Sequence, residues 1–141
     1  MKPRKTNFRQ LHDVTIAYAA NLRGAGVAYA EIAGEDEPRR IAFRLERFPA
    51  LLGREIGYAA LTAVAAALRA EGFRSVRLGI ADERVIEDLE QRRQLPQALT
   101  LSYVQLKCRL NTFSRVDVVV AHPSDDLAAR ARAEVELAVA A

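Results

Sequence analysis

Three short apolar segments stand close together near the start of the chain, and they constrain its fold more than any other feature. Residues 14–20 and 25–32 are apolar runs, and residues 40–48 alternate between apolar and charged side chains. Only turn-forming residues separate them, at 21–24 and at 34–38. Segments of this length and pattern predict strands, and links this short join antiparallel neighbours. The sequence therefore predicts a three-stranded antiparallel meander.

Helices and two further strands are predicted after the meander. A long helix is expected over residues 52–70, because apolar positions recur there at helical spacing and Gly72 can end it. Beyond it the patterns predict strands and helices over these ranges: strands 75–80 and 115–121, and helices 83–91, 97–110 and 124–139. Strands that are joined through helices run parallel. The predicted fold class is α/β, a mixed five-stranded sheet with three antiparallel and then two parallel strands, flanked by helices.

Several side chains have predicted positions in these elements. In the helix over 97–110 we expect the apolar surface to be made by Leu99, Val104, Leu106 and Leu110. Asp82 stands where it can cap the helix that begins at 83. If the crossover through the long helix is right-handed, strand 14–20 is central and strand 75–80 lies parallel beside it.

Positive charge is concentrated in a short N-terminal arm, residues 1–12, which we expect to be flexible and to precede a single domain over residues 13–141. The arm contains Lys2, Arg4, Lys5 and Arg9, whereas the other residues carry 17 basic and 18 acidic side chains. A basic arm can hold phosphate. Its alternative role is that of a solubilising tail.

Composition excludes several kinds of protein and site. The single cysteine, Cys108, excludes an internal disulfide framework and a cysteine-rich zinc site. No apolar run has the length of a membrane span or the position of a signal peptide, so we expect a cytoplasmic protein without a membrane partner. His12 and His122 have no partner at metal-binding spacing and are predicted to lie on the surface.

The order of elements resembles the ribonuclease H fold, in its reverse-transcriptase-like (type 1 ribonuclease H) branch. The resemblance is carried by Tyr58-Ala-Ala-Leu in the long helix, by Asp82-Glu-Arg-Val-Ile after the fourth strand, and by the last strand with its loop over residues 113–123. It covers most of the chain after residue 13 and implies the same fold.

Family members that cleave the RNA of RNA–DNA hybrids use about four carboxylates to hold two divalent metal ions. At the matched positions this chain has no carboxylate: Ala19, Gly57, Ala81 and Arg130. The resemblance therefore implies a domain that lacks the catalytic groups and needs no cofactor. The alternative is a metal-dependent ribonuclease whose site is displaced, with Mg²⁺ or Mn²⁺ held by Glu55, Asp82 and Glu134.

Two functions without catalysis remain for such a domain. It is predicted to bind nucleic acid (RNA–DNA hybrid, RNA or DNA) by phosphate contacts with little sequence specificity, through these basic side chains: Lys2, Arg4, Lys5, Arg9, Arg23, Arg40, Arg44 and Arg130. An aromatic content of 6% without tryptophan offers little for base stacking. The alternative is a protein-interaction or assembly module, with a protein partner or a second copy of the chain.

Overall fold

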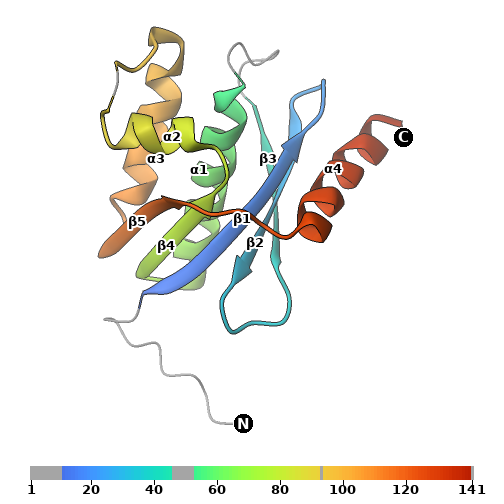
Figure 1. Ribbon diagram of the computed structural model, residues 1–141, viewed down its shortest axis with the longest axis horizontal. Coiled ribbons are helices and arrows are strands. Elements are labelled where there is room, and N and C mark those ends of the chain that lie inside the picture. Colours follow the sequence, from blue (N-terminus) through green and yellow to red (C-terminus); the bar gives the residue numbers. More distant parts are fainter. Residues whose placement is uncertain (1–10, 46–52, 93, 141) are drawn as a thin grey trace.

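A computed structural model of the chain describes residues 11–45, 53–92 and 94–140. Its strands form one sheet in the order β3-β2-β1-β4-β5 (Figure 1). The strands are β1 (His12–Ala20), β2 (Ala25–Ile32), β3 (Arg39–Arg44), β4 (Ser75–Ile80) and β5 (Arg115–Val120). The first three are antiparallel neighbours, whereas β4 runs parallel to β1 and β5 runs parallel to β4. This arrangement confirms the predicted five-stranded mixed sheet with the first strand at its centre.

The helices cover both faces of the sheet (Figure 1). They are α1 (Arg54–Glu71), α2 (Glu83–Leu89), α3 (Thr100–Leu110), which follows a 3-10 turn (Gln97–Leu99), and α4 (Asp125–Ala140). The first three helices share a core with one face, and α4 packs on β1 and β2 from the other. Within the residues described, no helix combines the length and the apolar character that crossing a membrane requires.

Two separate cores follow from the alternation of side chains along β1. Val14 and Ile16 point toward α1 and belong to the larger core, together with buried residues such as Tyr58 of α1. Ala17 points the other way and belongs to a smaller core under α4. That second core contains Ala17, Val27, Tyr29, Leu127, Ala131 and Val135.

Charged side chains occupy the part of the α4 face that lies over β1, β4 and β5. Asp13, Arg77 and Asp117 are direct neighbours across these three strands. A nitrogen of Arg77 lies 3.2 Å from Asp13 and another lies 3.9 Å from Asp117. Exposed pairs of this kind contribute little to stability, about 0–1 kcal/mol each. They nevertheless explain why these strands alternate between apolar and charged residues.

A close contact joins the outer strand β3 to β2. Gly26 is directly opposite Phe43, and the aromatic ring covers the glycine so closely that a Cβ at residue 26 would clash with it. The glycine is therefore required here by the approach of the ring.

Some predicted boundaries differ from the structure. β1 begins at His12 instead of residue 14, and the helix expected over 83–91 ends at Leu89. The backbone of Gln91 has a φ of 58°, which α-helical geometry excludes. The helix expected over 97–110 divides into the 3-10 turn and α3. β3 ends at Arg44, so Leu45 lies beyond the strand. Residues 46–48 of its predicted range lie outside the described residues, as does residue 52 of the predicted long helix.

Two predicted positions were wrong. His12 is buried, with 9% of its surface exposed, and its ring packs edge-to-face on Phe73 with 5.0 Å between ring centres. The reason is that His12 has the same parity along β1 as the core residues Val14 and Ile16. Val104 is 49% exposed because it lies about 100° around α3 from Tyr103, which packs against the core. His122 is exposed, as predicted.

Candidate functional site

Three of the four positions matched to the family's carboxylates come to one end of the sheet. Ala19 is near the end of β1, and Ala81 directly follows β4. Because β1 and β4 are parallel neighbours, their carboxyl ends lie at the same edge. Gly57 is in the first turn of α1 and reaches this edge through contact with Tyr18. The fourth position, Arg130, is in the second turn of α4.

The space beside Gly57 is occupied by the side chain of Tyr18. A Cβ at residue 57 would lie 3.0 Å from the Tyr18 hydroxyl oxygen and 3.2 Å from a methyl carbon of Val85. A glutamate side chain at this position would therefore have to displace the phenol. Burial and the negative charge of Asp82 raise the pKa of Tyr18 to about 12, although Arg84 opposes the shift. The phenol is thus neutral at physiological pH.

The three carboxylates proposed for a displaced site are held in different environments. Glu55 is buried in the first turn of α1, with 7% of its surface exposed. Asp82 is the N-cap of α2, as predicted, because its Oδ1 accepts a hydrogen bond of 3.0 Å from the backbone N–H of Arg84. The Arg84 guanidinium also pairs with Asp82 Oδ2 at 3.1 Å.

Glu134 belongs to a polar cluster between α4 and the strands β2 and β3. The Tyr29 hydroxyl donates a hydrogen bond of 2.5 Å to Glu134 Oε1, and Arg40 forms an ion pair of 2.7 Å with Oε2. The hydrogen bond from Arg40 is the main cause that holds the pKa of Glu134 below its usual value. The guanidinium carbon of Arg130 lies 4.6 Å from the centre of the Tyr29 ring, at cation–π distance.

The described residues form no cluster of protein ligands for a divalent metal ion. Among them, no group of three or more histidine, cysteine, aspartate or glutamate side chains lies close enough together to hold a metal ion. Mg²⁺ requires several oxygen ligands in near-octahedral geometry. The contacts of Asp82 and Glu134 direct these carboxylates to neighbouring arginines instead.

The predicted phosphate-binding arginines form two pairs in the structure. Arg23, in the turn between β1 and β2, and Arg44, at the end of β3, are both exposed. They lie near each other, because Arg44 is paired with Ala25 and the next N–H, of Leu45, donates to the carbonyl of Gly24 at 2.9 Å. We call Arg23 and Arg44 the basic rim. Both lie at the end of the sheet where β1 finishes.

The other basic residues are placed differently. Arg40 and Arg130 form the second pair, on either side of Glu134. Lys2, Arg4, Lys5 and Arg9 lie outside the described residues. The arm joins the fold at the start of β1, which is the opposite end of this strand from the basic rim.

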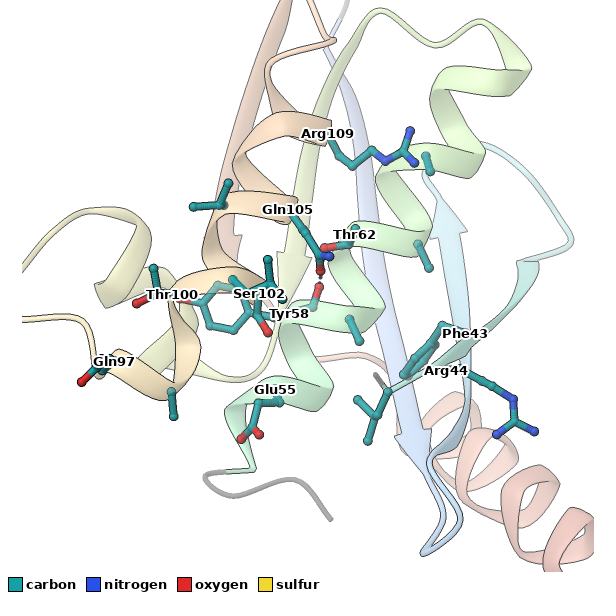
Figure 2. A pocket seen from close by; sticks show the side chains of 17 residues that line it. Phe43, Arg44, Glu55, Tyr58, Thr62, Gln97, Thr100, Ser102, Gln105 and Arg109 are labelled. Atoms are coloured by element: carbon teal, nitrogen blue, oxygen red, sulfur yellow. Dashed lines mark hydrogen bonds between the residues drawn. The ribbon is translucent and has the colours of Figure 1, made fainter. Parts of the chain in front are cut away.

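A groove of about 680 Å³ lies between α1, α3 and the end of β3 (Figure 2). Its floor includes small side chains of α1, and its outer wall includes Leu101, which is 57% exposed. Glu55 and Arg109 also line it, and Arg44 lies apart from Arg109 in Figure 2. The charged side chains among the described lining residues are thus two arginines and one carboxylate.

The sequence interpretation missed a buried ion pair next to this groove. Asp88 of α2 is 2% exposed, and both of its carboxylate oxygens lie 3.0 Å from Nη1 of Arg54. The Tyr58 hydroxyl donates a further hydrogen bond of 2.9 Å to Asp88. Burial and this bond raise the pKa of Tyr58. The signal in the sequence was an acidic residue that lies two positions after Ile86 and directly before Leu89, both apolar.

Compared by sequence, the chain matches no protein family and no curated protein. Compared by structure, it is similar to several ribonucleases H. RNase H1 from the halophilic archaeon Halobacterium salinarum is 18% identical with a TM-score of 0.67, over 93% of this chain and 98% of that one. The N-terminal RNase H domain of a Mycobacterium tuberculosis protein, solved as a fusion with maltose-binding protein, is 17% identical with a TM-score of 0.67, over 92% and 96%.

A third similar structure has a lower TM-score. LC9-RNase H1, a type 1 RNase H with the type 2 active-site motif, is 14% identical with a TM-score of 0.55, over 93% of this chain and 74% of that one. At such low identity these similarities show the fold but not the chemistry, which must be argued from the residues of this chain. Together with the strand order, they show that the chain has the ribonuclease H fold.

Proposed function

We propose that this chain is a catalytically deficient ribonuclease H-like domain that binds nucleic acid by phosphate contacts with little sequence specificity. The observation that carries the proposal is the contact between Tyr18 and Gly57. A phenol stands where the side chain of a metal-binding glutamate would begin, and Ala19 and Ala81 supply no oxygen ligand nearby. The domain thus retains the fold, whereas packed side chains such as Tyr18 occupy the place of the metal ligands.

Binding of nucleic acid is supported by the position of the basic rim. Arg23 and Arg44 are exposed at the edge where the matched positions Ala19, Gly57 and Ala81 lie. None of the ion pairs observed among the described residues involves either arginine. Their guanidinium groups are therefore available to phosphate oxygens.

The catalytic part of the proposal is tested by incubating the purified chain with an RNA–DNA hybrid and Mg²⁺ or Mn²⁺. We expect no hydrolysis. Metal-dependent cleavage that is abolished in Asp82→Asn or Glu55→Gln would instead show a displaced active site.

The binding part is tested with a hybrid, a duplex and a single strand, each titrated at several salt concentrations. The double variant Arg23→Ala/Arg44→Ala is compared with Arg115→Ala/Arg132→Ala, which removes the same charge from exposed sites on β5 and α4. We expect only the rim variant to reduce the salt slope on duplex DNA, by about 0.9 for each phosphate that the protein no longer neutralises. Equal effects of the two variants would mean that net charge, and not the rim, controls binding.

A second candidate function, that of a protein-interaction module, is favoured by a different part of the molecule. The outer edge of β5 has backbone groups that no other described strand pairs with.

A further inference from the structure

The strand β5 ends the sheet with an open edge. It is paired on one side only, with β4. Near its two ends, the N–H of Arg115 donates to the carbonyl of Arg74 and the N–H of Ala121 donates to the carbonyl of Ile80. Because the direction of backbone groups alternates along a strand, those of Val116, Val118 and Val120 point away from β4. Within the described part of the chain, no strand lies against them.

A groove runs along this edge, between β5 and α2. It has a volume of about 410 Å³ and is lined by three consecutive valines, 118–120, and by residues of the helix and the turn after it. Val120 is 41% exposed. Natural proteins usually protect such edges with charge, bulges or covering segments, because an open edge can pair with another chain. Apolar side chains at the end of an unpaired strand are suited to receiving one.

The described residues that line the groove carry more negative than positive charge. They include Glu83 and Glu87 of α2 and Glu90, its C-cap, and among them Arg92 is the one basic residue. Arg92 is paired with Glu90 at 3.1 Å. The phosphate backbone of a nucleic acid would be repelled here, so this surface is separate from the one proposed for nucleic acid.

The same charge disfavours a second copy of the chain. Two β5 strands paired antiparallel across a two-fold axis would have their α2 helices on the same face of the joined sheet. The glutamates of both copies would then approach one another, and like charges placed together are destabilising.

From the open edge and its charge we propose that β5 binds an extended, basic segment of a partner protein as an added sixth strand. Main-chain hydrogen bonds to Val116, Val118 and Val120 would provide affinity. Side chains of the added strand alternate between the two faces of the sheet. Every second side chain therefore faces α2 and its glutamates, and the chemistry of the site selects lysine or arginine at alternate positions.

The test uses the peptide Lys-Val-Lys-Val-Lys-Val, labelled with a fluorophore, and the full chain, with binding followed by fluorescence anisotropy. A peptide of equal composition, Lys-Lys-Lys-Val-Val-Val, is the comparison. We expect the alternating peptide to bind at least tenfold more tightly. Equal affinities would overturn the proposal, because charge alone would then account for binding.

Two variants of the protein locate the site. Glu83→Gln/Glu87→Gln should weaken binding of the alternating peptide at least tenfold. Glu31→Gln/Glu136→Gln removes the same charge from exposed positions on β2 and α4 and should leave binding unchanged. Equal losses in the two variants would contradict a site at α2.

Backbone methylation tests the added strand itself. N-methyl groups at one alternate set of peptide residues should abolish binding, whereas the other set, whose N–H groups point away from β5, should be tolerated. Hydrogen exchange at the Val116, Val118 and Val120 amides should slow when the parent peptide binds. Binding that tolerates both methylated peptides, or that leaves these amides unprotected, would overturn the proposal. A chain that self-associates at micromolar concentration, with loss of the dimer in Val118→Pro, would show a second copy as the occupant and would equally overturn it.

Discussion

The hydroxyl oxygen of Tyr18 lies 3.0 Å from the position that a Cβ at Gly57 would take. One residue comes from the central strand and the other from the first turn of α1, so the contact closes the junction between sheet and helix at the end of β1. The packing at this junction limits which side chains can be introduced there. A carboxylate side chain introduced at residue 57 alone would contact the Tyr18 phenol and would have to displace it before it could bind a metal ion.

This contact predicts a dependence of residue 57 on residue 18. In the native chain we expect Gly57→Ala to lower the free energy of unfolding by about 1 kcal/mol, because the added methyl group overpacks the junction. In a Tyr18→Phe background the same change should be neutral or stabilising, since alanine is favoured over glycine in helices by roughly 1 kcal/mol. Urea denaturation of the native chain, the two single variants and the double variant gives the interaction energy between residues 18 and 57. An interaction below about 0.3 kcal/mol would show that Val85 or the backbone, and not the hydroxyl, limits the space.

A second prediction concerns the buried ion pair of α1 and α2. Removing Asp88 by Asp88→Ala leaves the guanidinium of Arg54 buried without its partner, and we expect a loss of about 3–5 kcal/mol in the free energy of unfolding. Tyr58→Phe removes one hydrogen bond to the same carboxylate and should cost less, about 1–3 kcal/mol. Urea unfolding measures both. Equal losses would show that the carboxylate acts mainly through Tyr58.

The third prediction is a pH dependence at Glu134. Its native pKa is lowered below 4.5, chiefly by the hydrogen bond from Arg40, so the ionised form stabilises the fold. That contribution is present above the unfolded-state pKa and is lost as the pH falls through the lower native pKa. Glu134→Gln should therefore lower the free energy of unfolding at pH 7. The difference in this free energy between the variant and the native chain should become smaller below about pH 4.5. A difference that stays constant down to about pH 2 would contradict this assignment.

The fourth prediction concerns the length of the nucleic acid. Residue 12 and the basic rim are separated by the nine residues of β1, or about 30 Å. A duplex needs about nine base pairs to span that distance, at roughly 3.4 Å per base pair. If residues 1–10 bind phosphate near the start of β1, deleting them should weaken binding to long duplexes more than any single substitution does, and should matter less for duplexes of about five base pairs. Arg130→Ala is the control, and a larger loss from it than from the deletion would place binding on α4.

The fold could be predicted because its signals are local. Strand and helix patterns, the turns between them and the glycine at the end of α1 each depend on neighbours in the sequence. The short turns and the right-handed crossover predict the central position of the first strand and the parallel strand beside it, and the structure confirms both.

The candidate site was less predictable because its contacts join distant residues. Tyr18 and Gly57 are 39 positions apart, and only the assembled junction shows that the phenol fills the space of the missing side chain. Asp88 was missed for a similar reason, since its buried partner Arg54 comes from another helix. His12 is buried because β1 begins two residues before its predicted start, so that its side chain lies on the same face as Val14.

The division of the interior into two cores has a consequence for how the molecule opens. The residues that hold α4 to the sheet are distinct from those of the larger core, and they are few. Local opening costs less than global unfolding when it breaks a small cooperative unit. The last helix can therefore detach as a unit while the rest of the sheet keeps its other layer. Such an event would uncover Tyr29, separate Arg130 from the Tyr29 ring and release Arg40 from Glu134, which moves with the helix. The positive charge that β3 presents would therefore vary with the docking of a single helix.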